Sequence, residues 1–340
     1  MFYGFSLPHG FLLMTHSDSF HFQPCSHSWV AIHPQPVGVV QFMGGAFFGT
    51  YPTLFYRQLL RQFYEAGYTV VALPFRFTLD HWGIALTLLQ EHYALRPFII
   101  EAAQQQGYST DVYLDAANYC WLGHSLGCKY IALLELLSNP QEIFTAYSEG
   151  IGIEARQWTG ISRSRLALTH TLRQIEADIH KLTGQSINYA QPSIWNEASL
   201  LLAPTITDLN GAVPIKLLEQ PLSRVLKVAP TVEQTHTLIR RSKLFNLTHI
   251  IQFSEDAIAQ PTCNRLIQQQ PRITHSLLSG NHLSPLGWKL GCELGWKRSE
   301  TAASHQGRQK AVSALIGLQR QLKLQTKSQL DSSELVAVNR

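Results

Sequence analysis

The 340-residue sequence has few charged residues and lacks long apolar runs, and each shortage excludes a class of protein. Only 15% of its residues are charged, whereas 45% are hydrophobic, which excludes an intrinsically disordered chain and indicates a globular protein with a large core. A membrane-spanning helix needs about 18 consecutive apolar residues, and no such run occurs. We therefore expect no transmembrane segment.

Cysteines are also few, and their spacing excludes two kinds of site. The five cysteines are odd in number, scattered and without a Cys-x-x-Cys pair, so we expect neither a disulfide framework nor a zinc site. This cysteine usage also favours a reducing compartment. They are Cys25, Cys120, Cys128, Cys263 and Cys292. Five histidines near the N-terminus fit no metal-ligand spacing. They are His9, His16, His21, His27 and His33. We expect no metal and no cofactor.

Positive charge is missing from most of the chain. The first lysine or arginine is Arg57, which predicts neither a secretory signal nor a transit peptide and favours a cytoplasmic location. From residue 295 onward there are eight Lys/Arg against three Asp/Glu, whereas residues 1–294 hold 19 against 20. Because the body carries no basic excess, we expect no nucleic-acid partner.

What the sequence does contain is an alternation of strand-like and helical segments. Helical patterns cover residues 50–67, residues 82–105 with an interruption near Pro97, and residues 126–137. The strand-like runs are "SWVAIHP", "VGVVQFMGG", "YTVVALP", "ANYCWL", "ASLLLAPTI", "LTHIIQF" and "RITHSLL". Strands that alternate with helices over short connections predict an α/β fold, with a mostly parallel central sheet and helices on both faces.

The alternation also predicts the domain organisation. We expect an irregular lead-in over 1–27, a core over 28–138 and 198–294, a helical cap insertion over 139–197, and a basic tail helix over 295–340. The insertion is either a mobile lid or a set of extra helices packed at the sheet edge. For the tail we expect a solvated or loosely docked helix, with contact to an acidic partner or a membrane surface as the alternative. The sequence indicates no oligomeric state.

One motif carries chemistry. "GHSLG", residues 123–127, places Ser125 between two glycines, after an apolar run and before a helical one. A nucleophile elbow needs this strand, tight turn and helix, and side chains two positions either side of the serine would collide. The alternative is a serine that only caps the helix.

A serine nucleophile needs a histidine base oriented by an acid, which follow it in the chain in the order acid, then histidine. Asp256 comes just after "HIIQF", and His282 follows the next strand-like run. Glu255 and Asp208 are alternatives for the acid. We interpret His275, within a strand, as a core or surface residue. We interpret His124 as a packing residue that faces away from the serine.

Backbone N–H groups must also stabilise the oxyanion. The first donor is the N–H of Leu126, directly after the serine. The second comes from "FMGGAFFG", where the glycine pair lets the backbone pass close to a substrate, with Gly45 or Ala46 as the donor. The alternative for this segment is a plain strand-to-helix turn.

Several segments resemble, in order, an uncharacterised α/β-hydrolase-like family of cyanobacteria and plant plastids. They are "GVVQFMGGAFFGTYPTLFYRQLLRQFYEAGYTVVALPF", "LDHW", "GHSLGCK", "SLLLAPTITD", "QFSEDAIAQ" and "SGNHLSPL". The resemblance covers roughly residues 28 to 295 and implies the α/β-hydrolase fold and a serine-hydrolase-like site at Ser125, with Asp256 and His282 in matching segments. It implies no substrate. Met43 departs from many hydrolases, which have histidine before the oxyanion glycine.

These observations predict a serine hydrolase that acts on an acyl ester or thioester through Ser125, Asp256 and His282 and a covalent acyl intermediate. The expected partner is a small-molecule acyl substrate. Phenylalanines around the oxyanion segment favour a hydrophobic acyl group over a charged substrate, and the alternative is that they belong to the core. They are Phe42, Phe47 and Phe48. The second hypothesis is a non-catalytic binding or assembly factor of the same fold, because fold does not guarantee function.

Overall fold

The computed structural model describes residues 20–206, 228–243, 245–286, 288–290, 296–298, 305–321 and 324. Within these residues the core is an eight-stranded sheet in the order β1-β2-β4-β3-β5-β6-β7-β8. β2 runs antiparallel to both of its neighbours, β1 and β4, and β3 to β8 run parallel to one another. The strands are β1 Gln23–Cys25, β2 Ser28–Ala31, β3 Gly38–Met43, β4 Tyr68–Ala72, β5 Tyr119–His124, β6 Ala198–Leu202, β7 Thr248–Phe253 and β8 Thr274–Leu278. The mostly parallel sheet is confirmed, and each strand-like run forms one of β2 to β8. β9 Trp288–Leu290 and β10 Trp296–Arg298 form a separate antiparallel pair.

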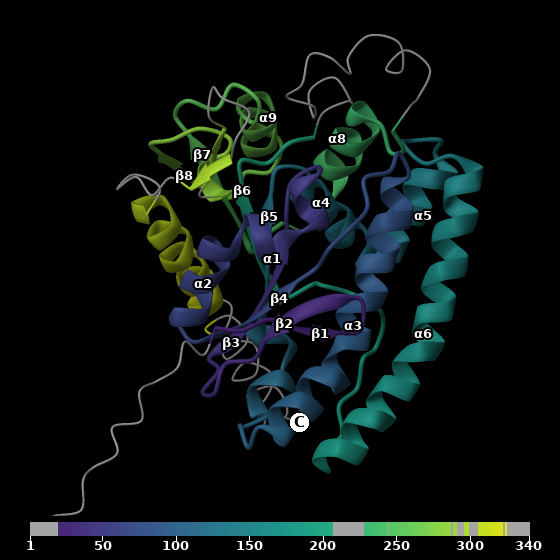
Figure 1. The fold of residues 1–340 in the computed structure, drawn as a ribbon. Coiled ribbons are helices and arrows are strands. Elements are labelled where there is room, and N and C mark those ends of the chain that lie inside the picture. The colour runs from purple at the N-terminus through teal and green to yellow at the C-terminus, as the bar shows by residue number, and fades with distance from the viewer. Residues whose placement is uncertain are drawn as a thin grey trace, which may run out of the picture.

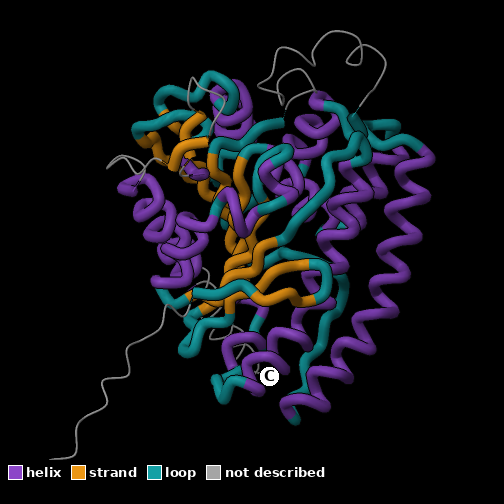
Figure 2. The backbone as a smooth tube through the Cα atoms, in the orientation of Figure 1, coloured by secondary structure: helices purple, strands orange, loops and turns teal. Residues whose placement is uncertain are grey.

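Helices cover both faces of the sheet. The longer helices are α1 Pro52–Phe55, α2 Arg57–Glu65, α3 His81–Gln105, α4 Leu126–Leu137, α5 Pro140–Ser148, α6 Ala155–Thr183, α8 Val232–Arg241, α9 Gln260–Gln269, and a helix over 305–321. Short 3-10 turns are η1 Phe48–Thr50, η2 Asp111–Tyr113, η3 Ala116–Asn118 and η5 Ser284–Leu286. α2 and the helix over 305–321 lie on one side of the sheet, and α3 and α6 lie on the other (Figure 1). The strands form a twisted ribbon between these two helical layers (Figure 2).

Two predicted helices differ from the observed ones. The helix expected over 50–67 is broken at Tyr56, which separates α1 from α2 and has a fully buried side chain. The interruption expected near Pro97 was wrong, because α3 continues through this proline. A proline inside a helix removes one hydrogen bond, but α3 buries side chains along its whole length, and this packing maintains the helix.

The insertion expected over 139–197 forms α5 and α6. α6 packs along the outer side of α3 and makes a further helical layer (Figure 1). Its buried apolar side chains recur at helical spacing and include Ile161, Leu168, Leu172, Ile175 and Ile179. The Arg165 guanidinium donates to the Leu137 carbonyl at the end of α4. The insertion is thus packed against α3 and α4, and its interpretation as a mobile lid stays a prediction.

The tail helix is more firmly docked than expected. Gln319 is buried, and its side chain accepts from the Tyr68 hydroxyl at 2.7 Å and donates to the Asn118 carbonyl at 3.1 Å. Ala311 and Leu315 are buried on the same face. The expectation of a solvated or loosely docked helix was therefore wrong for 305–321, because its apolar stripe packs beside α2. Residues 1–19 of the lead-in and the tail beyond 321, except 324, lie outside the described residues.

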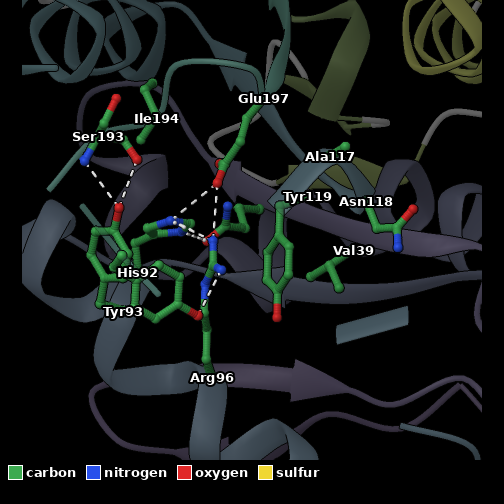
Figure 3. Close-up of polar contacts among 12 residues, drawn as sticks. Val39, His92, Tyr93, Arg96, Ala117, Asn118, Tyr119, Ser193, Ile194 and Glu197 are labelled. Atoms are coloured by element: carbon green, nitrogen blue, oxygen red, sulfur yellow. Dashed lines mark hydrogen bonds and ion pairs between the residues drawn. The ribbon is translucent and has the colours of Figure 1, made fainter. Parts of the chain in front are cut away.

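A buried polar cluster fixes α3 to the sheet (Figure 3). Arg96 forms an ion pair with Glu197 at 3.0 Å, and both side chains are 1% exposed. The Trp121 indole N–H donates to the same carboxylate at 2.7 Å, and His92 bonds the Gln41 amide oxygen at 2.7 Å. Glu197 directly precedes β6, so the cluster lies toward the amino end of that strand. Removing one charge of this buried pair would leave the other uncompensated and strongly destabilise the fold.

Candidate active site

Ser125 occupies a sharp turn between β5 and α4, with φ of 54° and ψ of −117°. A positive φ is rare for a residue with a side chain and stores local strain. The flanking glycines make the turn possible. A Cβ at Gly123 would lie 2.8 Å from Ile131 Cδ1, and one at Gly127 would lie 2.3 Å from the Met43 carbonyl oxygen. The steric argument for glycines two positions either side of the serine therefore holds in the structure.

Gly127→Ala provides a test of this packing. The new methyl would meet the Met43 and Gly44 carbonyls, which are backbone atoms and cannot rotate away. We expect a loss of about 3 kcal/mol in the free energy of unfolding and displacement of the Ser125 turn. Chemical denaturation measures the loss. Gly160→Ala in α6 is the control, because a Cβ there meets nothing within 4 Å and should be neutral or slightly stabilising. Equal stability of the two variants would contradict the steric argument.

The Ser125 hydroxyl does not cap α4. It stands at the N-cap position but makes no side-chain hydrogen bond to the helix amides. Its Oγ instead lies 2.9 Å from His282 Nε2. Ser125 is 8% exposed, and its backbone N–H donates to the Leu202 carbonyl at 3.0 Å, which joins the turn to the end of β6. The hydroxyl is thus paired with an imidazole at the carboxyl edge of the sheet.

Asp256 and His282 come from the loops after β7 and β8. His282 Nδ1 lies 2.9 Å from Asp256 Oδ2, and the Asp256 side chain is fully buried. The other carboxylate oxygen accepts from the N–H groups of Ile258 at 3.1 Å and Ala259 at 2.9 Å. Burial opposes ionisation of Asp256, but the hydrogen bond and charge of His282 and the bond from Ala259 outweigh it and lower the pKa of Asp256.

The proton positions follow from these partners. An ionised carboxylate only accepts hydrogen bonds, so His282 Nδ1 carries a proton toward Asp256. In the neutral ring Nε2 is then an acceptor, and it receives the Ser125 O–H. This arrangement allows the imidazole to take the hydroxyl proton when the serine attacks a carbonyl.

The alternatives for the acid and the base do not join this cluster. Glu255 is exposed, and its backbone N–H bonds the Gly280 carbonyl. Asp208 lies outside the described residues. His275 is exposed within β8, in agreement with its interpretation as a surface residue. Ser125, Asp256 and His282 are therefore the residues that the structure brings together.

The two oxyanion candidates from "FMGGAFFG" differ in the structure. The Gly45 N–H donates to the Tyr56 hydroxyl at 2.8 Å, so it is already used. Within the described part of the chain, the N–H groups of Ala46 and Leu126 donate to no protein acceptor. The loop lies against the serine, because a Cβ at Gly45 would lie 3.1 Å from Ser125 Cβ. Among the described residues, the amides of Ala46 and Leu126, which follow Gly45 and Ser125 in the chain, therefore have no protein acceptor, whereas the Gly45 amide has one.

His124 has contacts that sequence reasoning missed. Its Nδ1 lies 2.8 Å from the Tyr56 hydroxyl, and its Nε2 lies 2.8 Å from the His282 carbonyl oxygen. Burial, and after it the charge of His282, lowers the pKa of His124 to about 3, so the ring is neutral near pH 7. The interpretation of His124 as a packing residue was incomplete, because its ring bonds the backbone of His282. Only its position beside Ser125 hinted at this.

Neither a metal cluster nor a membrane span is found in the parts of the chain that the structure describes. No three His, Cys, Asp or Glu side chains there are grouped to hold a metal ion. Among the same residues, no helix combines the length and apolarity needed to cross a bilayer.

The fold is that of the α/β-hydrolases, as comparison with solved structures shows. The carboxylesterase Cest-2923 from Lactobacillus plantarum matches with a TM-score of 0.50 and 13% identity, over 88% of this chain and 96% of that chain. Esterase B from Lactobacillus rhamnosis matches with a TM-score of 0.48 and 12% identity, over 92% and 91% of the two chains. A thermophilic esterase from Thermogutta terrifontis matches with a TM-score of 0.47 and 13% identity, over 88% and 92%.

The resemblance to an uncharacterised family is confirmed by a family model. Residues 21–149 match the family described as "Protein of unknown function (DUF1350)". This range includes Tyr56, His124 and Ser125 and ends before Asp256 and His282. No curated protein sequence matches the chain.

Proposed function

We propose that this protein is a serine hydrolase that cleaves small-molecule acyl esters or thioesters through a covalent acyl-enzyme. The observation that carries the proposal is the unbroken hydrogen-bond chain from the Asp256 carboxylate through His282 to the Ser125 hydroxyl, with both links at 2.9 Å. The comparisons support the fold, whereas the proposed reaction rests on the geometry of the site, because one fold can host many functions.

Acylation follows from this geometry. Ser125 Oγ attacks the substrate carbonyl carbon while His282 Nε2 takes the hydroxyl proton, and the carbonyl π electrons move to oxygen. The N–H groups of Leu126 and Ala46 stabilise the resulting oxyanion, and one such donor contributes about 3 to 4 kcal/mol to lowering the barrier. The tetrahedral intermediate collapses, the bond to the leaving alcohol or thiol breaks, and His282 donates its proton to that group.

Deacylation repeats these steps with water. His282 Nε2 takes a proton from a water molecule, the hydroxide attacks the acyl carbon, and the Ser125 oxygen leaves and regains its proton from the imidazole. The free acid departs. The ionised Asp256 stabilises the imidazolium in both halves of the reaction and holds the ring in the required tautomer.

The surroundings of the site favour a hydrophobic acyl group. Phe47, two residues after Gly45, is 45% exposed and stacks on Phe77 with ring centroids 5.0 Å apart. Ile258, two residues after Asp256, is also exposed. Exposed apolar side chains on the loops that carry Gly45 and Asp256 favour burial of an apolar substrate group, which releases water from both surfaces. Phe42 is fully buried in the core and does not contribute to this surface.

A fluorophosphonate probe tests the proposal directly. The probe phosphonylates an activated serine, so we expect covalent labelling at Ser125, located by peptide mass spectrometry. The untreated protein should hydrolyse p-nitrophenyl esters, and the protein labelled by the probe should not. Because the surroundings are apolar, octanoate should be turned over faster than acetate. Failure of the folded protein to label would reject the hydrolase and support the non-catalytic binding factor.

A further inference from the structure

Two buried residues beside the candidate triad connect three segments that are far apart in sequence. Tyr56 is fully buried at the break between α1 and α2, and His124 is 1% exposed at the end of β5. The Tyr56 hydroxyl contacts the Gly45 amide in the oxyanion loop, and His124 contacts the His282 carbonyl in the loop after β8. A single pair of side chains therefore contacts both the oxyanion loop and the backbone of the candidate general base.

The partners of Tyr56 and His124 determine the direction of every hydrogen bond that these two side chains make. The His282 carbonyl only accepts, so His124 Nε2 carries the proton of the neutral ring. Nδ1 is then the acceptor, and the Tyr56 O–H must donate to it. The phenol oxygen in turn accepts from the Gly45 N–H. Each donor has one acceptor, so rotating either ring would leave buried polar groups unpaired, at a cost of about 1 to 3 kcal/mol each.

We propose that Tyr56 and His124 are positioning residues that hold the oxyanion loop and the His282 imidazole in register with Ser125. This inference rests on the proposed function. The Gly45 amide donates to the Tyr56 hydroxyl, so the next amide, that of Ala46, remains for the substrate oxygen. His124 in turn fixes the backbone of the residue whose ring takes the serine proton.

The packing supports this assignment. The His124 and His282 rings lie 5.1 Å apart between centroids, and the Tyr56 ring lies 5.5 Å from His124 and 4.6 Å from Phe42. A Cβ at Gly45 would lie 3.3 Å from both His124 Nδ1 and the Tyr56 hydroxyl, so the loop is in close contact with both polar atoms. Catalytic geometry is sensitive to such supports, because a shift of about 1 Å can reduce a rate about 100-fold.

The experiment compares Tyr56→Phe, His124→Asn and the double variant. Phenylalanine keeps the ring but loses the hydroxyl, and asparagine can accept from Tyr56 but is too short to reach the His282 carbonyl. We expect each single variant to lower kcat for p-nitrophenyl butyrate and the rate of fluorophosphonate labelling about 10- to 100-fold. KM should change less than about threefold, because both side chains are buried and so are not available to contact the substrate. The kcat of the double variant should be no more than about threefold below that of the less active single variant, because both substitutions break the same set of hydrogen bonds.

Tyr113→Phe is the matched control. Tyr113 is also fully buried, and its hydroxyl bonds Thr69 at 2.8 Å in another part of the core. We expect this control to lower the melting temperature as Tyr56→Phe does but to leave kcat at the wild-type value. His124→Gln, whose longer amide can donate to the His282 carbonyl, should recover part of the rate lost in His124→Asn. If His124→Asn does not fold, Tyr56→Phe decides the question, because it breaks the same set of hydrogen bonds.

Wild-type kcat in folded Tyr56→Phe and His124→Asn, or losses that multiply fully in the double variant, would overturn the inference alone. The wild-type protein would still label in that case. Absence of labelling in the wild-type protein would overturn the proposed function and this inference together, so the two failures are distinguishable.

Discussion

Ser125→Ala is expected to lower kcat about 10⁶-fold toward acyl esters and to abolish fluorophosphonate labelling. In the proposed mechanism the Ser125 hydroxyl is the protein group that forms the covalent bond to the acyl carbon, and an alanine methyl cannot replace it. The substitution should leave the fold intact, because the hydroxyl caps no helix and bonds only His282 among the described residues. Alanine also has a Cβ, so the strain of the positive φ is unchanged.

Stopped-flow and long-time assays of p-nitrophenyl esters measure this loss. The residual rate should stay above that of water alone, because the amides of Leu126 and Ala46 still polarise the carbonyl. Ser148→Ala, on the exposed end of α5, is the control and should retain the wild-type rate. Near-native turnover in Ser125→Ala would reject the mechanism even if the probe labels the wild-type protein.

The parts of the fold that sequence predicts well are those set by local physics. A parallel strand covered on both faces is a continuous apolar run, so β3 to β7 are visible as such. The turn at Ser125 needs glycines at fixed positions, so the sequence of the motif predicts the geometry of the turn. The loops holding Asp256 and His282 follow neighbouring parallel strands, whose carboxyl ends meet at one edge. Their side chains therefore come together from chain order alone.

The parts that sequence misses depend on single long-range contacts. The break at Tyr56 interrupts a pattern that predicts one continuous helix, and its purpose is visible only when the hydroxyl meets Gly45 and His124. The choice between Gly45 and Ala46 as a donor depends on that same bond. For the tail, the amphipathic spacing was visible, but the buried Gln319 that bonds Tyr68 across the chain had no local signal. Tertiary contacts decide these cases, and periodicity does not report them.

Asp256→Asn is expected to lower kcat about 10⁴-fold while preserving the fold. The amide has nearly the same shape, and its oxygen can still accept from the Ile258 and Ala259 N–H groups. Its NH₂ group then points at His282 Nδ1 and donates to it. The imidazole must place its proton on Nε2, where it can no longer accept the Ser125 hydroxyl proton.

The neighbouring carboxylate provides a matched control for this second effect. Glu255→Gln removes the charge of an exposed side chain that is one residue away from Asp256. We expect the kcat of this variant to stay within about twofold of wild type, because surface charges act weakly through solvent. Single-turnover acylation measured for both variants separates orientation of the imidazole from general electrostatics. Equal losses would mean that net charge near the site matters and the tautomer does not. A large loss in Asp256→Asn alone follows only if the buried carboxylate holds the His282 ring in the tautomer that accepts the serine proton.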